Sequence, residues 1–408
     1  MQRGWGWGLS GVVAPLRLAR LARLARLARL ARRPYLTPLC VSLPPWGREM
    51  RRPAGPSKGE GSPPQQKVQL MRAFDHIAVR STDDAIAALR DGQPTGAAQT
   101  PTEPANKLIA GGTDLLTLMK ADLIAPARLI DVKPIRSLRY IQLEEDGAVR
   151  IGAGATLADI ERHAELAERL PILRQAVRDA ATPQLRAMAT VGGNLLQRNR
   201  CWYFRGPYNC WLKGGAECFA REGENKYQAI FDESPCVAVH PSDLAPALIA
   251  LDATVAIEGQ QGARTVSVAD LLQPPSDDTR IEHRLDADEL IVAFDIPAQA
   301  PHTHGVYLKM MDRQAWAFAL VSAAAQVTLR SGKVRQARLV LGGVANTPRR
   351  ITAAESLLIG QPLTPALAAQ VAEAAVADAM PLAHNRYKVA LARELVRRAL
   401  LLAAGMEF

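Results

Sequence analysis

Four of the five cysteines in the 408-residue sequence lie between residues 201 and 236, in a segment that begins CWYFRGPYNCWLKGGAEC. Four thiolates can bind a zinc ion or a cubane iron–sulfur cluster. Structural zinc sites usually contain close C-x2–4-C pairs, whereas the spacing here is C-x8-C-x7-C-x17-C. Disulfides are a third possibility, although disulfide-dependent proteins are usually small and rich in cysteine. The pattern favours an iron–sulfur cluster and leaves zinc and disulfides as alternatives.

Two Gly-Gly turns precede these cysteines. The segment KLIAGGTDLLTLMK (107–120) predicts a strand, a turn and a helix, with Thr113 and Asp114 at the helix N-cap, and MATVGGNLL (188–196) predicts a second strand-like run. A strand that enters such a turn before a helix gathers backbone N–H groups, which can bind a diphosphate. A capped turn without a ligand would show the same pattern, and the G-x-G-x-x-G fingerprint is absent. The turns are therefore candidate nucleotide sites, and their spacing does not identify the nucleotide.

The elements around these motifs predict an α+β fold from Met71 onward, because strands are followed by segregated helices. We expect helices at residues 81–91, 157–181, 364–379 and 386–405. Strands are expected at residues 127–132, 149–156, 289–297, 318–329 and 334–344, and residues 243–259 are expected to alternate into a further strand. A break at residues 298–305 predicts a domain boundary near residue 300.

The basic charge of the chain belongs to its first seventy residues. They contain thirteen Lys and Arg against two Glu, a net charge of +11, so residues 71–408 carry −1 of the total of +10. A nucleic-acid-binding role for the body therefore has little electrostatic support. We expect residues 1–70 to form a disordered basic leader, either a targeting segment or translated upstream sequence, with the functional chain beginning at Met71. No segment approaches the roughly 20 apolar residues of a membrane span.

Three motifs in order resemble the FAD-binding subunit of the molybdenum hydroxylases, the family of xanthine dehydrogenase and aldehyde oxidoreductase. They are KLIAGGTDLLTLMK, MATVGGNLLQ and PSDLAPALIALDA (241–253). The resemblance covers essentially Met71 to the C-terminus. It implies an FAD-binding PCMH-type, vanillyl-alcohol-oxidase-like domain at residues 71–299, with a Cys-rich loop at 197–240. A domain like the C-terminal domain of the carbon monoxide dehydrogenase flavoprotein would follow at residues 300–408.

The same resemblance implies the residues that contact FAD. The first motif would wrap the diphosphate, the second would run along the flavin and the diphosphate, and the SDL motif would supply polar contacts. Later segments, ELIVAFDIP and YLKMMDR, would lie near the flavin or the adenine end, although a lysine there could also be a solvated surface residue. The implied contacts are Lys107, Leu108, Ile109, Ala110, Gly111, Gly112, Thr113, Asp114, Leu115, Thr190, Gly193, Asn194, Ser242, Asp243, Ile291 and Lys309.

Within the family, the cysteine segment is similar to that of the periplasmic aromatic aldehyde oxidoreductases, whose FAD subunit carries a [4Fe–4S] loop beginning RCxYFR. Here RCWYFRG stands at residues 200–206. The resemblance implies that the cluster ligands are Cys201, Cys210, Cys218 and Cys236. Cys40 lies in the leader and has no partner. We expect the interleaved aromatic residues to shield the cluster by apolar packing rather than to carry electrons; they are Trp202, Tyr203, Phe204 and Trp211.

The function implied is that of an electron-transfer flavoprotein subunit of an oxidoreductase, in which no side chain of this chain is catalytic. Its partners would be a molybdenum-bearing large subunit, which oxidises an aldehyde, and a small subunit with [2Fe–2S] clusters, together in a heterotrimer. Electrons would leave FAD for an external acceptor, in the periplasm after co-export with a partner or in the cytoplasm. Two rivals are a stand-alone flavin oxidase, which needs a substrate domain, and a zinc-stabilised scaffold protein without redox activity.

Overall fold

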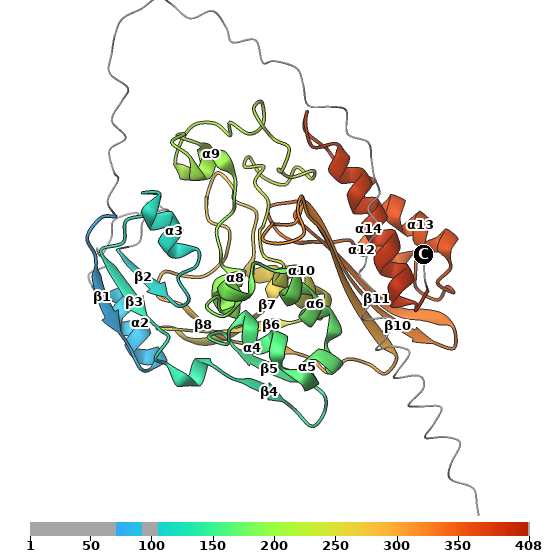
Figure 1. Cartoon of the computed structure of the whole chain (residues 1–408), viewed down its shortest axis with the longest axis horizontal. Helices are drawn as coiled ribbons and strands as arrows, with labels where there is room; N and C mark the ends of the chain where they lie inside the picture. Colours follow the sequence, from blue (N-terminus) through green and yellow to red (C-terminus); the bar gives the residue numbers. More distant parts are fainter. Residues whose placement is uncertain (1–70, 92–104, 407–408) are drawn as a thin grey trace, which may run out of the picture. The chain divides into compact units, whose positions relative to one another are not determined.

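Three β-sheets organise the part of the chain that the computed structural model describes, residues 71–91 and 105–406 (Figure 1). The strands are β1 (Asp75–Ala78), β2 (Asn106–Ile109), β3 (Arg128–Asp131), β4 (Ile141–Leu143), β5 (Val149–Gly152), β6 (Thr254–Gly259), β7 (Gly262–Ser267), β8 (Leu290–Ile296), β9 (Thr303–Met310), β10 (Val321–Arg330), β11 (Lys333–Gly342) and β12 (Arg349–Arg350). A parallel sheet has the order β1-β3-β2, and two antiparallel sheets have the orders β4-β5-β8-β6-β7 and β12-β11-β10-β9. The expectations for residues 1–70, including Cys40, lie outside the described residues.

Most of the helices occur where their apolar periodicity and caps predict them. Ser81 accepts a hydrogen bond from the backbone N–H of Asp84 and caps the helix α2, and Thr364 caps α13. The helices are α2 (Thr82–Arg90), α3 (Leu115–Lys120), α4 (Leu157–Arg162), α5 (Ala164–Arg169), α6 (Pro171–Asp179), α7 (Pro183–Arg186), α8 (Val191–Leu195), α9 (Trp202–Arg205), α10 (Leu244–Ala250), α11 (Val268–Leu271), α12 (Thr352–Ser356), α13 (Pro365–Ala374) and α14 (Tyr387–Ala403), with 3₁₀ turns at η1 (Arg136–Leu138) and η2 (Trp211–Lys213). The predicted α+β class is confirmed.

Two hydrophobic cores lie on the antiparallel sheets. One joins the five-stranded sheet to α4, α6 and α10, and all seven residues of α10 are buried. The other lies between the four-stranded sheet and the helices α13 and α14, which cover it in Figure 1. The helices α6 and α10 also contact strands of the four-stranded sheet. The last hundred residues therefore pack directly on α6 and α10, and α10 in turn contacts α8, which carries the second glycine turn.

The second glycine turn differs from its prediction. Residues 191–195 form the helix α8, not a strand-like run. The β-branched residues Thr190 and Val191 suggested extended structure, but the Thr190 side chain accepts a hydrogen bond from Gly193 N–H and starts a helix there. Similarly, residues 244–250 form α10 before β6 begins. The Thr190 cap at α8 and the complete burial of α10 outweigh the local strand signals at these two places.

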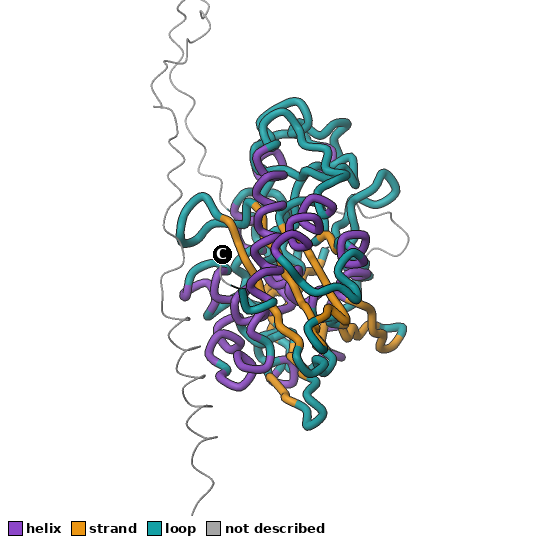
Figure 2. Tube along the Cα trace, turned by 90° about the vertical axis from the view of Figure 1, so that its right-hand side faces the viewer, coloured by secondary structure: helices purple, strands orange, loops and turns teal. Residues whose placement is uncertain are grey.

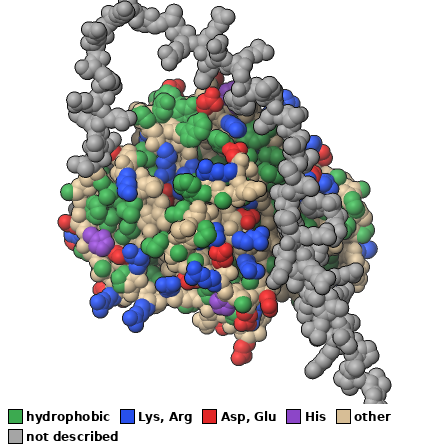
Figure 3. Space-filling view, viewed as in Figure 1, with side chains coloured by type: hydrophobic (Ala, Val, Ile, Leu, Met, Phe, Trp, Pro, Cys, Tyr) green, Lys and Arg blue, Asp and Glu red, His purple; other side chains and the backbone are tan. Residues whose placement is uncertain are grey.

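The cysteine segment forms a lobe made mostly of loops. Figure 2 shows this lobe at the top, where α9 lies in Figure 1. The side chains of Tyr203, Tyr208 and Phe219 pack on one another there, with ring centroids 4.9–6.2 Å apart. The predicted apolar packing is found for the buried Phe204 and Trp211, whereas Trp202 is 57% exposed. Figure 3 shows hydrophobic and basic side chains side by side on this face.

Candidate functional site

The first Gly-Gly turn leaves a run of backbone N–H groups without acceptors. Gly112 has a φ of 68°, a left-handed conformation that glycine adopts without strain. Within the described part of the chain, no backbone N–H from Gly111 to Leu115 donates to an acceptor. The helix α3 has only six residues, so its dipole adds little. The N–H groups themselves form a nest that can hold an anion.

The two glycine turns touch each other. A Cβ atom on Gly111 would lie 2.0 Å from the carbonyl oxygen of Met188 and 3.2 Å from the Cα of Ala189. These two residues lead directly into the second turn at Thr190. Only glycine can occupy position 111 with this backbone spacing, because no real Cβ atom stands that close to an oxygen. The structure thus brings together two motifs that are about eighty residues apart in the sequence.

The second turn is hydrogen-bonded to the chain that follows β5 and to the SDL motif. The N–H groups of Val191 and Gly192 donate to the carbonyls of Ala155 and Ala153, each over 2.9–3.0 Å. The Ser242 hydroxyl donates to the Asn194 side-chain oxygen over 2.7 Å. Ser242 is buried, whereas Asn194 is half-buried and its amide group is the accessible end of the pair. The first three predicted motifs therefore meet, and their contact with FAD stays a prediction.

Asp243 and Lys309 form a buried ion pair. The Lys309 ammonium donates to Asp243 Oδ2 over 2.7 Å and to the carbonyl of Asp179 over 2.9 Å, and the Tyr307 hydroxyl donates to Asp243 Oδ1 over 2.7 Å. The Lys309 side chain is 1% exposed, so it is not a solvated surface lysine. Burial raises the pKa of the Asp243 carboxyl, and the Lys309 charge opposes that rise. This pair joins α10 to β9, and thus the predicted FAD domain to the predicted C-terminal domain.

Replacing Lys309 by methionine is expected to destabilise the fold by about 3–5 kcal/mol, because it leaves the Asp243 carboxylate buried without its cation. Urea unfolding of the variant against wild type measures the loss. Lys333→Met, at an exposed position, is the matched control. A loss below about 1 kcal/mol would contradict the structural role of the pair.

The stability of the Lys309→Met variant is expected to depend on pH. Without Lys309, burial holds the folded-state pKa of Asp243 above its unfolded value of about 3.9. The folded state then binds more protons than the unfolded state above that pH, so the variant loses stability as the pH rises. We expect a larger deficit at pH 8 than at pH 5, and the added change Asp243→Asn should remove most of this difference.

Lys107 and Ile291, also predicted contacts, have different surroundings. Lys107 is half-buried on β2, and burial together with the Arg198 charge lowers the pKa of its ammonium to about 8, while Glu282 opposes that change. A cation in this place suits a phosphate. Ile291 is 4% exposed in the core of the five-stranded sheet, so its side chain contributes packing. Whether either residue contacts FAD stays a prediction.

The four cysteines of the lobe are brought together as free thiols in one hydrophobic cluster. Each sulfur accepts hydrogen bonds from backbone N–H groups that lie nearby. Cys201 accepts from Tyr203 and Phe204, Cys210 from Leu212 and Lys213, Cys218 from Ala220 and Val237, and Cys236 from Ala238. The Gln228 amide adds a donor 3.4 Å from the Cys201 sulfur. Such donors stabilise thiolates, and this arrangement is typical of the surroundings of metal-bound sulfur.

Side chains at the start of the C-terminal helix α14 form hydrogen bonds with the backbone of this lobe. The ammonium of Lys388, which is fully buried, donates to the carbonyls of Tyr227, Gln228 and Gly343 over 2.6–3.2 Å. Asn385, also fully buried, donates to the carbonyls of Gln228 and Ala229. Burial lowers the pKa of Lys388 to about 7. The segment that supplies Gln228 to Cys201 is thus fixed by Lys388 of α14 and by Asn385, which lies just before this helix.

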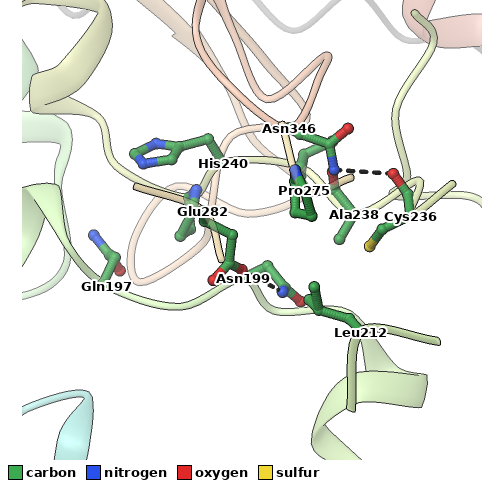
Figure 4. Close-up of a pocket in the computed structure, with 11 residues that line it drawn as sticks. Gln197, Asn199, Leu212, Cys236, Ala238, His240, Pro275, Glu282 and Asn346 are labelled. Atoms are coloured by element: carbon green, nitrogen blue, oxygen red, sulfur yellow. Dashed lines mark hydrogen bonds between the residues drawn. The ribbon is translucent and has the colours of Figure 1, made fainter. Parts of the chain in front are cut away.

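A small cavity of about 10 Å³ lies between the end of the second glycine turn and Cys236 (Figure 4). Gln197 and His240 line it on the side of the turn, and Cys236 and Leu212 line it on the side of the lobe. The Asn346 amide donates to the Cys236 carbonyl, while its own oxygen is buried without a hydrogen-bond partner among the described residues. The space is about that of one water molecule.

Three arginines between the second turn and the first cysteines were not among the predicted site residues. Arg198 donates its backbone N–H to Asp114 Oδ2 over 2.9 Å, and the guanidinium groups of Arg200 and Arg205 contact Asp114 Oδ1 at 2.6 and 2.9 Å. Asp114 occupies the N-cap position of α3 but makes no side-chain capping bond. The signal was present in the sequence as QRNRCWYFR, a dense run of arginine in a body of nearly neutral charge.

Two further findings describe what the site does not contain. Within residues 71–91 and 105–406, no three His, Cys, Asp or Glu side chains stand close enough together to hold a single metal ion. No helix in the same part of the chain has the length and apolarity to cross a membrane.

Two protein families match the chain. Residues 72–299 match the FAD binding domain in molybdopterin dehydrogenase, and residues 306–403 match the CO dehydrogenase flavoprotein C-terminal domain. The first match covers more than half of the chain.

Individual proteins agree with these models. The aldehyde oxidoreductase FAD-binding subunit PaoB of Escherichia coli K12 is 39% identical over 295 residues, 71% of this chain and 89% of that protein. The carbon monoxide dehydrogenase medium chain of Hydrogenophaga pseudoflava is 30% identical over 337 residues, 80% of this chain and 96% of that protein. A solved structure of carbon monoxide dehydrogenase from Hydrogenophaga pseudoflava superposes with a TM-score of 0.64 at 27% identity, covering 83% of this chain and 99% of that one.

Proposed function

This chain belongs to the FAD-binding subunits of the molybdenum hydroxylases, and on that premise we propose that its four-cysteine lobe holds a [4Fe–4S] cluster beside the FAD. The chain is an oxidoreductase subunit that binds FAD. The finer proposal is that it serves an aldehyde oxidoreductase with a molybdenum-bearing large subunit and a small [2Fe–2S] subunit. In it, residues 71–299 form the FAD domain, and residues 300–408 the C-terminal domain.

The observation that carries the proposal is the set of N–H donors around the four sulfurs. Disulfide sulfurs do not require a hydrogen-bond donor each, and none of the four cysteines forms a disulfide. A cubane iron–sulfur cluster takes four thiolate ligands, and hydrogen bonds to its sulfurs tune its potential, so the donor set fits such a cluster.

The FAD site is supported in the same way. The N–H groups from Gly111 to Leu115 would hold the diphosphate, and Lys107 would add a positive charge to that end. The amide of Asn194, fixed by Ser242, would orient the cofactor. When bound, FAD and the cluster supply the electron-transfer chemistry of the subunit, and the chain's side chains position them and exclude water. The zinc-scaffold rival does not explain this second site.

The experiment is a metal and flavin assay on the full complex purified without oxygen. We expect about one FAD and about four irons per copy of this chain, with no zinc. Zinc in place of iron would reduce the lobe to a structural clamp and contradict the cluster, while leaving the FAD assignment intact. Absence of FAD would contradict the site at the glycine turns.

A further inference from the structure

Lys388, at the start of α14, is a fully buried cation that pairs with no carboxylate in the described part of the chain. Its ammonium donates to the carbonyls of Tyr227, Gln228 and Gly343, so three acceptors use its three N–H groups. A neutral amine has one N–H fewer, and this set of contacts therefore requires the charged form.

A buried ammonium without an anion is unusual, because lysine is almost never fully buried unless it is paired. The Lys309 ammonium shows the usual arrangement, since its buried side chain contacts Asp243 Oδ2 at 2.7 Å. The carbonyl groups around Lys388 replace only part of the water that it loses, and burial still lowers its pKa to about 7. An anion nearby would offset this cost, and the described residues supply none at contact distance.

The cysteine lobe lies one residue away from Lys388. The carbonyl of Gln228 accepts from Lys388 over 2.8 Å, and the side-chain amide of the same residue donates to Cys201 Sγ over 3.4 Å. The Lys388 nitrogen and the Cys201 sulfur are therefore within about 13 Å of each other, because a glutamine residue can span no more. Gln228 and Lys388 are both buried, so water screens this charge only weakly.

We propose that Lys388 is the counter-charge of the cysteine centre and raises the reduction potential of the cluster bound there. The inference rests on the proposed function, because it requires the cluster. Four thiolates around a cubane make a net anion, and reduction adds one electron to it. A fixed cation therefore stabilises the reduced form more than the oxidised form. Helix α14, near the C-terminus, thereby controls how readily the lobe takes up an electron.

The test is a redox titration of the full complex with mediators. Electron paramagnetic resonance at low temperature follows the reduced [4Fe–4S] cluster apart from the [2Fe–2S] clusters. Lys388→Met removes the charge and keeps an unbranched side chain. At about 13 Å and an effective dielectric constant of about 20, one charge changes the equilibrium constant for reduction about tenfold. We expect the potential of the cluster to fall by the corresponding amount, about 59 mV for one electron.

Two control variants separate the charge of Lys388 from its effect on position. Lys226→Met removes an exposed cation two residues from Gln228, which water screens, and should leave the potential unchanged. Asn385→Ala removes the hydrogen bonds to the carbonyls of Gln228 and Ala229 without removing a charge, and should also leave it unchanged. A fall in Asn385→Ala as large as that in Lys388→Met would assign the effect to position and overturn the proposal.

A second variant keeps the test decisive if Lys388→Met does not assemble. Lys388→Gln keeps a hydrogen-bond donor and loses the charge, and an unchanged potential in it overturns the proposal. The outcomes also separate the inference from the proposed function. An iron-loaded complex with the same potential in wild type and in the Lys388 variants contradicts the inference alone. A wild-type complex with FAD but no iron contradicts the cluster, and the inference with it.

Discussion

A chain in which Gly111 is replaced by alanine is expected to be purified without FAD. The new Cβ would lie 2.0 Å from the Met188 carbonyl oxygen, a backbone atom that cannot rotate away. The two glycine turns would have to separate, and the backbone of the N–H nest would shift with them. We expect FAD affinity to fall at least a hundredfold, since relieving such an overlap costs about 3 kcal/mol or more. Flavin absorbance of the purified complex measures the effect.

Substitutions at two other glycines, with smaller expected effects, serve as comparisons for Gly111→Ala. Gly112→Ala places a Cβ 3.1 Å from the flexible Leu116 side chain at a φ of 68°, so its cost is mainly the left-handed backbone, about 1–2 kcal/mol. Gly360→Ala has similar backbone strain at a φ of 78° in open space, and it should keep full FAD content. Normal flavin occupancy in Gly111→Ala would remove the glycine turns from the FAD site.

Local rules of capping and periodicity were enough to predict most elements. Ser81 and Thr364 cap helices as their residue types suggest, and α14 follows its apolar spacing over seventeen residues. They failed at Val191–Leu195, where a threonine cap and hydrogen bonds to the chain just after β5 produce a helix that starts at the β-branched pair Thr190 and Val191. That outcome depends on a contact with Ala153 and Ala155, which no local pattern contains.

The sequence predicted which residue types form the site more completely than it predicted which residues pair with one another. The glycine turns and the cysteines follow from their residue types, because glycine and thiolate have few substitutes in these roles. The partners of charged residues do not follow from the sequence. Lys309 pairs with Asp243 across 66 positions, and Asp114 collects arginines more than eighty positions away. Such pairs are selected by the packing of distant elements, and only the structure shows that the Asp114 carboxylate faces the lobe rather than its own helix.

The second large effect is expected from Cys210→Ser. Cys210 is 5% exposed, and the N–H groups of Leu212 and Lys213 point at its sulfur. A serine hydroxyl fills nearly the same space but is not a thiolate at neutral pH, so one of the four cluster ligands is lost. We expect iron to fall from about four to less than one per chain.

The loss of iron should also destabilise the subunit, because metal-site binding energy is part of the folding energy of a loop with little core of its own. Thermal unfolding of the complex and its yield report this effect, and iron analysis reports the ligand itself. Cys40→Ser, at the fifth cysteine, is the control and should retain iron. Full iron content in Cys210→Ser would exclude Cys210 as a ligand.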